Sequence, residues 1–209
     1  DGTIYVFNWK GDSLYAIQVA VYGERWLNLG ELRQALSVNW AGWEVLRARL
    51  AALPKFGHGH PGVDALAARL SADLAACARA LENERGGTFQ PSLFVYYAFV
   101  KMAKDVRATP DGRRAGELLS QGAGPGRVNP STSLTEILQS VSRVDYVDHP
   151  GNAVVDVQLP AGGRIEPETL AAVIRTFARM GGATIQFNCV SADQLRDAQV
   201  HPERHRDLQ

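Results

Sequence analysis

The last third of the chain limits the possible folds most, because strand and helix patterns alternate there. "NAVVDVQLP" (152–160) and "ATIQFNCVS" (183–191) are typical of strands, and "EPETLAAVIRTFARMGG" (166–182) between them is typical of a helix. Pro167 suits the first helical turn, and Gly181 suits the position just past the helix end. This order predicts a βαβ unit with two parallel strands and a right-handed crossover.

The first half of the chain has the amphipathic spacing of helices. Asp12 or Ser13 is the expected N-cap of the first helix, and Pro54 is expected to end the third. We predict three helices, over residues 11–24, 29–38 and 42–53. All four tryptophans lie in this region, where we expect them to anchor packing.

The clearest helical pattern runs from Pro61 to Glu84. An apolar row at helical spacing is expected to face the core, and its members are Leu66, Leu70, Leu74, Cys77 and Leu81. Cys77 should therefore be buried. Cys189 alternates with Ile185 and Phe187 in the last strand, so it should also point toward a packed face.

Three further elements are expected between and after these segments. Residues 89–99 are rich in aromatic and β-branched residues, as in a buried strand, although Pro91 argues against a central position for its first part. Residues 131–142 and 192–200 are predicted to be helical. His149 and His201 stand beside prolines, which predicts solvated turns at both positions.

Composition excludes several classes of protein. Lys and Arg together number 22, as do Asp and Glu, so the charge favours neither nucleic acid nor an anionic membrane as a partner. No apolar run reaches the length of a membrane span, and "DGTIYVFNWK" at the start does not have the pattern of a secretory signal. The two cysteines form no CxxC pair, which predicts a reducing, cytoplasmic location.

Few short motifs carry chemistry. His58 and His60, with Asp64 beyond, could bind a metal on a loop, but no further Cys/His cluster completes a zinc site. "GAGPGR" (122–127) lacks the Lys-Ser/Thr of a P-loop, and neither GxGxxG nor GxSxG occurs. "TPDG" (109–112) has the chemistry of a tight turn, which needs no function by itself.

Several longer stretches, in order along the chain, resemble the C-terminal portion of the glycyl radical enzymes, the pyruvate formate-lyase-like superfamily. They are "GDSLYAIQVAVY", "RGGTFQPSLF", "ATPDGRRAGE", "SLTEILQSVSRVDY" and "GGATIQFNCVSADQLRDAQVHPERHRDL". The resemblance implies an α/β fold that contributes the second half-sheet, with flanking helices, to a ten-stranded barrel. Residues 1–60 would form a helical segment, and residues 61–209 an α/β part of the same domain, ending before the glycyl radical domain.

The resemblance also implies roles for individual residues. Thr109, Asp111 and Arg113 would support the loop that carries the radical, and an arginine beside a carboxylate can fix a loop by bidentate hydrogen bonds. Gln186 and Asn188 would support the cavity or the same loop. Ser92 and Phe94 would face the substrate from a strand beside the cavity.

The catalytic groups of the family are not expected in this chain. Such enzymes need a glycine in an RVxGY-like motif and a cysteine on an upstream loop, and neither motif occurs. We expect no bound cofactor or metal here. The complete enzyme would hold a glycyl radical installed by a radical S-adenosylmethionine activase.

The expected partners are the remainder of the enzyme, its activase and a small organic substrate, in a homodimer when complete, and the chain alone should be inactive. The reaction implied is that of a radical lyase or dehydratase. Two alternatives stay open: a non-catalytic remnant that serves as a binding or assembly partner, and an independent metal-binding module at His58 and His60.

Overall fold

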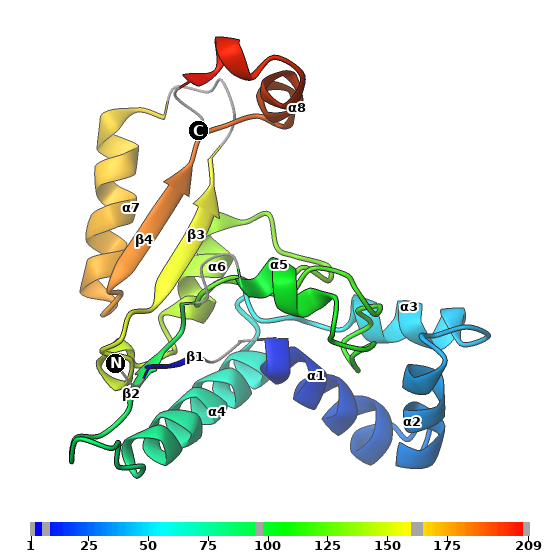
Figure 1. Ribbon diagram of the computed structural model, residues 1–209. Coiled ribbons are helices and arrows are strands. Elements are labelled where there is room, and N and C mark those ends of the chain that lie inside the picture. The colour runs from blue at the N-terminus through cyan, green and yellow to red at the C-terminus, as the bar shows by residue number, and fades with distance from the viewer. Residues whose placement is uncertain (1–2, 6–8, 95–97, 160–164, 207–209) are drawn as a thin grey trace.

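The computed structural model describes residues 3–5, 9–94, 98–159 and 165–206 (Figure 1). The helices are α1 (Trp9–Ile17, continued by a π-helical stretch, Gln18–Gly23), α2 (Leu29–Ser37), α3 (Glu44–Ala52), α4 (Pro61–Arg79), α5 (Ala98–Ala103), α6 (Leu134–Val141), α7 (Pro167–Arg179) and α8 (Ala192–Val200). The strands are β1 (Thr3–Tyr5), β2 (Gln90–Ser92), β3 (Val154–Gln158) and β4 (Thr184–Asn188). Within these ranges, no helix combines the length and the apolar character that a bilayer crossing requires.

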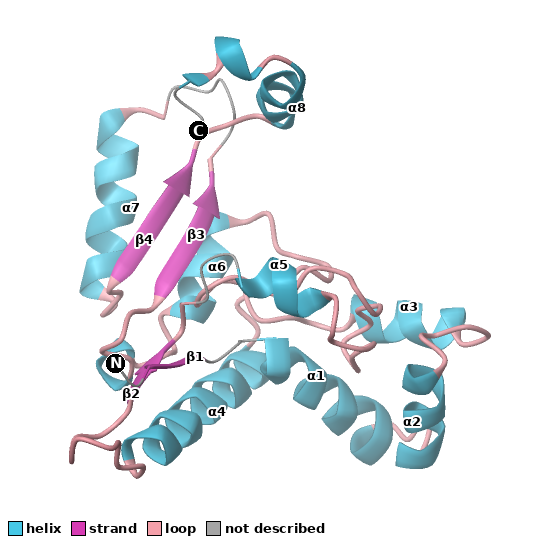
Figure 2. Cartoon of the chain, viewed as in Figure 1, coloured by secondary structure: helices cyan, strands magenta, loops and turns pink. Residues whose placement is uncertain are grey.

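The βαβ unit forms as predicted. Strands β3 and β4 pair in parallel, from Val154 opposite Thr184 to Gln158 opposite Asn188. Helix α7 begins with Pro167 and ends before Gly181, whose φ of +87° suits glycine. Figure 2 shows the two strands side by side, with α7 running beside β4. The side chain of Phe177 joins this helix to the core beneath the strands.

The helical first half also forms, but α1 begins earlier than expected. Its first residue is Trp9, so Asp12 and Ser13 lie inside the helix and the predicted N-cap is wrong. Both side chains are buried, and Asp12 accepts a hydrogen bond from the Phe56 amide at 2.7 Å. Trp40 is fully buried, while Trp26 and Trp43 pack partly exposed against the same core. The side chain of Trp9 lies outside the described residues.

Helix α4 buries a different face from the one predicted. Its buried apolar positions are Val63, Ala67, Ala75 and Ala78. Small residues allow α1 to approach closely, since a Cβ on Gly11 would lie 3.2 Å from the Cβ of Ala67. The leucines are partly exposed, with Leu81 at 52%, and Cys77 is exposed. Cys189 is exposed as well, so both expectations of buried cysteines are wrong.

The stretch 89–99 forms a much shorter strand than its composition predicts. Among its described residues, Gln90–Ser92 forms strand β2 and pairs with β1, and helix α5 begins at Ala98. Leu93 adds one parallel bridge to Ala153 next to β3. Residues 95–97 of the predicted strand lie outside the described residues. The predicted helix over 131–142 is present as α6, with Ser133 as its N-cap.

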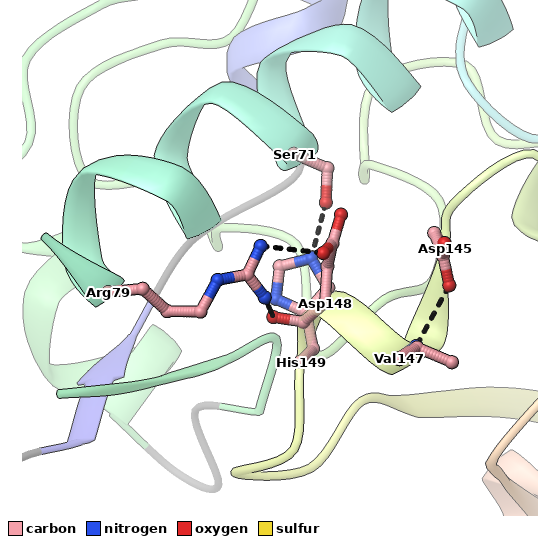
Figure 3. Close-up of polar contacts among 6 residues, drawn as sticks. All are labelled: Ser71, Arg79, Asp145, Val147, Asp148 and His149. Carbon is pink, nitrogen blue, oxygen red and sulfur yellow. Dashed lines mark hydrogen bonds and ion pairs between the residues drawn. The ribbon is translucent and has the colours of Figure 1, made fainter. Parts of the chain in front are cut away.

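A hydrogen-bonded contact fastens the segment before β3 to α4 (Figure 3). His149 is only 3% exposed, and its Nε2 lies 2.6 Å from the Ser71 hydroxyl on α4. Arg79 pairs with Asp148 at 2.7 Å beside this contact. The predicted solvated position of His149 is therefore wrong, because Ser71, far away in sequence, covers it. Burial lowers the pKa of His149, with Asp148 opposing the shift.

This burial predicts a loss of stability at acidic pH. Below the ordinary histidine pKa of about 6.5, the unfolded chain takes up a proton that buried His149 resists, so the free energy of unfolding should fall by up to about 1.4 kcal/mol per pH unit. Urea unfolding at pH 7.5 and 5.5 should show a steeper loss for the native chain than for His149→Gln. His201→Gln, at a half-exposed site, is the control. Equal slopes for the native chain and His149→Gln would contradict the prediction.

Candidate functional site

One face of the β3–β4 pair is polar. The register places Asp156 beside Gln186 and Gln158 beside Asn188, and because side chains alternate along a strand, all four share one face. We call them the polar row. The opposite face carries core residues, namely Val155, Val157, Ile185 and Phe187. Since parallel sheets are normally covered by apolar packing on both faces, a polar row on one face indicates a binding surface.

A hydrogen bond links two members of the polar row. The Gln186 amide donates to Asn188 Oδ1 at 3.2 Å. The carboxylate oxygen Asp156 Oδ1 is buried and has no hydrogen-bond partner within the described part of the chain. Burial raises the pKa of Asp156, and the charge of Arg127 and the Asn188 hydrogen bond oppose this.

A cleft of about 250 Å³ opens beside the polar row at the carboxyl ends of β3 and β4. We call it the strand-end cleft. It is lined by Gln121, Gly124, Pro125, Gly126, Arg127, Pro130, Ser131, Ile137, Asp156, Gln158 and Asn188. Three members of the polar row therefore meet a glycine-rich loop, residues 121–131. The arrangement offers several hydrogen-bonding side chains to a small molecule.

The loop that lines the cleft is fixed against β3. The Ala123 amide donates to the Val154 carbonyl at 2.6 Å. Gly122 next to it has a φ of +58°, and a Cβ at this position would collide with the same carbonyl oxygen. A side chain longer than hydrogen at residue 122 would therefore separate the loop from the strand. The position of this wall of the cleft is therefore fixed by its contacts with β3.

A buried arginine holds the turn formed by residues 106–117, which we call the Arg113 turn. Arg113 is 2% exposed, and its guanidinium donates to four main-chain carbonyls, those of Val106, Arg107, Arg114 and Glu117, at 2.5–3.2 Å. Its partners are thus carbonyls and not the carboxylate we anticipated. Burial lowers the pKa of Arg113, while Asp111 and Glu117 oppose the shift.

The Arg113 turn is also bound to the helical first half. Trp40 Nε1 donates to the Arg113 carbonyl at 3.1 Å, and Arg47 donates to the Gly112 carbonyl at 2.9 Å. The Ser13 hydroxyl donates to Asp111 Oδ1 at 3.1 Å. Contacts from α1, α3 and the α2–α3 connection therefore converge on three consecutive residues, 111–113.

A buried acid and a buried base connect these elements to the strand-end cleft. Burial raises the pKa of Asp12 to about 7 and lowers the pKa of Lys55, with each charge partly offsetting the shift of the other. Lys55 Nζ donates to the Leu50 and Leu53 carbonyls at 2.8 and 2.9 Å. A Cβ on Gly126, in the cleft loop, would lie 3.0 Å from Asp12 Oδ2. The Asp12 carboxyl thus packs directly against the cleft wall.

The residues singled out in the sequence lie in three places. Asn188 lines the strand-end cleft and Gln186 stands beside it in the polar row. Thr109, Asp111 and Arg113 are buried together in the Arg113 turn. Ser92 and Phe94 are not among the cleft residues; Ser92 is buried and donates to the Asn152 carbonyl at 3.0 Å, and Phe94 is half-buried. The roles assigned to these residues stay predictions.

Sequence reasoning missed Asp156, Gln158 and the loop 121–131. The alternation in "VVDVQ" was the available signal, because two polar residues at i and i+2 define one strand face. His58 Nε2 hydrogen-bonds the Asn129 carbonyl at 2.8 Å, and His60 caps α4. Among the residues that the structure describes, no three His, Cys, Asp or Glu side chains gather into a metal-holding group.

Two family matches divide the chain. Residues 8–102 match the family described as Pyruvate formate lyase-like, and residues 119–209 match the family described as Glycine radical. These matches cover the helical first half and the part that contains the strand-end cleft. The interval between them, residues 103–118, contains the Arg113 turn.

Individual relatives agree with this division. The chain is 30% identical to the Probable dehydratase YbiW of Escherichia coli over 95% of this chain and 26% of that protein. It is 28% identical to the isethionate sulfite-lyase of Nitratidesulfovibrio vulgaris over 94% of this chain and 24% of the relative. The glycerol-bound form of the B12-independent glycerol dehydratase from Clostridium butyricum superposes with a TM-score of 0.89 at 30% identity, covering 94% of this chain and 25% of that one. The chain therefore spans about a quarter of the length of these relatives.

Proposed function

We propose that this chain, whose two parts match the Pyruvate formate lyase-like and Glycine radical families, is the C-terminal barrel portion of a radical lyase or dehydratase. The remainder of the enzyme would complete the barrel, and the complete protein would act on a small organic substrate as a homodimer. The observation that carries the proposal is the polar row on a parallel sheet, which faces a cleft. The dehydratase and lyase names of the relatives support this reaction class.

The polar side chains that line the strand-end cleft suit a role in holding a reactant for the radical chemistry of the complete enzyme. In the complete enzyme, a glycyl radical would supply hydrogen-atom abstraction after installation by a radical S-adenosylmethionine activase. Asp156, Gln158 and Asn188 line the strand-end cleft and provide polar groups beside a bound molecule. Such groups orient a reactant, which matters because reacting atoms must be held in contact.

The Arg113 turn would position the wall of this site. Its main-chain geometry is fixed by Arg113, and its neighbours Trp40 and Arg47 attach it to the helical half. Asp12 then packs against Gly126 in the cleft loop. We infer that these buried polar groups keep the loop 121–131 in place, so that water and oxygen stay out of the reacting site.

Turnover by the complete enzyme tests this function. After anaerobic activation, the enzyme is offered glycerol, propane-1,2-diol, trans-4-hydroxy-L-proline and isethionate, and we expect an elimination product from at least one of them. The product is identified by mass spectrometry, with an unactivated sample as the control. An activated enzyme that carries the radical but converts none of them would favour the alternative of a non-catalytic binding partner.

A further inference from the structure

Asp12 lies where the two family-matched parts of the chain meet. It belongs to α1, in the part that spans residues 8–102. Its Oδ1 accepts a hydrogen bond from the Phe56 amide at 2.7 Å. On its other side, a Cβ on Gly126, in the part that spans residues 119–209, would lie 3.0 Å from Asp12 Oδ2. Since the side chain is only 2% exposed, a change in the Asp12 carboxyl acts on both parts of the chain.

The surroundings of Asp12 disfavour a negative charge on its carboxyl. Asp111, 3% exposed, accepts from the Ser13 hydroxyl of α1 at 3.1 Å, and buried Asp64 on α4 adds a third carboxyl nearby. The Lys55 ammonium donates to main-chain carbonyls and, within the described residues, forms no salt bridge with any of these acids. A buried carboxylate without a direct cationic partner is costly, and other carboxylates nearby increase the cost. This fold therefore favours the protonated, neutral form of Asp12.

The titration of Asp12 follows from this arrangement. Burial raises its pKa to about 7, and the charges of Asp111 and Asp64 act in the same direction, against the Phe56 amide and Lys55. An aspartate in an open, solvated segment has a pKa of about 3.9. Because the packed form binds the proton more tightly, the stabilisation is complete at acidic pH, is lost as the pH rises toward 7 and levels off above about pH 7.

We propose that Asp12 is a proton-dependent positioning residue: its neutral carboxyl packs the loop 121–131 against the helical first half, and loss of the proton weakens this packing. The effect reaches the strand-end cleft because Gly126, which lies against the carboxyl, also lines that cleft. The proposal adds a form of regulation to the proposed function, and it rests on that function in so far as the cleft holds the reacting site.

Two substitutions of Asp12 separate its proton from its packing. In Asp12→Asn, the amide oxygen can accept from the Phe56 amide and the NH₂ takes the place of the protonated Oδ2, but the side chain cannot ionise. Asp12→Ala removes these contacts at every pH. Asp105→Asn is the control, because Asp105 is exposed just after α5.

The loop is followed by hydrogen–deuterium exchange and mass spectrometry on the complete, unactivated enzyme at pH 6.0, 8.0 and 9.0. Each exchange rate is divided by the intrinsic rate of the unfolded peptide at the same pH, which gives a protection factor. The peptide of interest covers the loop 121–131, where the Ala123 amide donates to the Val154 carbonyl. A peptide from α7 is the reference for global unfolding.

In the native enzyme and in Asp105→Asn, we expect loop protection at least about threefold lower at pH 8.0 than at pH 6.0, with little further change at pH 9.0. Asp12→Asn should keep its loop protection at all three pH values, and Asp12→Ala should show low protection at all three. The α7 peptide should stay equally protected throughout. If a variant unfolds there, the pH dependence of the native loop decides alone.

Equal loop protection at pH 6.0 and 8.0 in the native enzyme would overturn the inference, and this result needs no variant. The native pH dependence in Asp12→Asn would overturn it too, because another group would then titrate. Low loop protection of Asp12→Asn at every pH, with α7 intact, would show a role in packing without the proton. Buried His149 cannot mimic the expected result, since it costs stability at acidic pH. No radical is needed, so the proposed function is tested separately, by spin and turnover.

Discussion

Replacing Arg113 with lysine is expected to lower the radical yield of the complete enzyme severalfold and to destabilise the chain. The guanidinium serves four main-chain carbonyls at once. The single nitrogen of lysine cannot reproduce this planar set of contacts. Since a hydrogen bond to a charged group contributes about 1.5–3 kcal/mol, the loss of two or more should cost roughly 3 kcal/mol or more.

Arg114 provides a matched control in the same turn. It is exposed, whereas Arg113 is buried, so Arg114→Lys should leave stability unchanged within about 0.5 kcal/mol. Radical yield is measured as spins per monomer by electron paramagnetic resonance, and stability as the urea midpoint of the chain. Equal spin and equal midpoints for Arg113→Lys and the native protein would show that the Arg113 turn does not support the radical.

The expected effect on the radical depends on the path from the Arg113 turn to the cleft. Trp40 and Arg47 attach the turn to the first helices, where Asp12 is buried. Asp12 in turn packs against Gly126. Because the Trp40 contact is buried and the Arg47 contact is partly buried, we expect movement of the turn to displace the loop that lines the cleft.

The sequence predicted best where local pattern and tertiary packing agree. The βαβ unit has strands of period two, a helix bounded by Pro167 and Gly181, and a length that leaves few other topologies. Gln186 and Asn188 of the polar row were singled out in the sequence, and their supporting role stays a prediction. Asp156 and Gln158 follow from the same alternation once the register of β3 and β4 is known.

The sequence predicted less where a distant partner decides the outcome. Helix α4 turns its small residues inward because α1 approaches closely, although a leucine row is the stronger apolar signal. His149 is buried by Ser71, 78 positions away, and Asp12 by its contact with Phe56, 44 positions away. No local pattern contains these pairings. The composition of residues 89–99 predicts one strand, yet in the described part of this stretch the strand β2 has three residues and helix α5 begins at Ala98.

The largest expected effect is all-or-none: the complete enzyme should acquire a glycyl radical, and the isolated chain should not. Family chemistry needs a spin-storing glycine and a cysteine that relays the spin to substrate in a sealed cavity. None of the 20 glycines here lies in an RVxGY-like motif. Cys77 and Cys189 lie on a helix and after a strand, at exposed positions outside the strand-end cleft.

Electron paramagnetic resonance after anaerobic incubation with a matched activase and S-adenosylmethionine measures this directly. Two samples are compared, the complete enzyme and the 209-residue chain alone, with an incubation that lacks S-adenosylmethionine as the control. We predict a glycyl doublet in the complete enzyme and none in the isolated chain. A doublet on the isolated chain, or a complete enzyme that stays silent while its activase cleaves S-adenosylmethionine, would contradict the account.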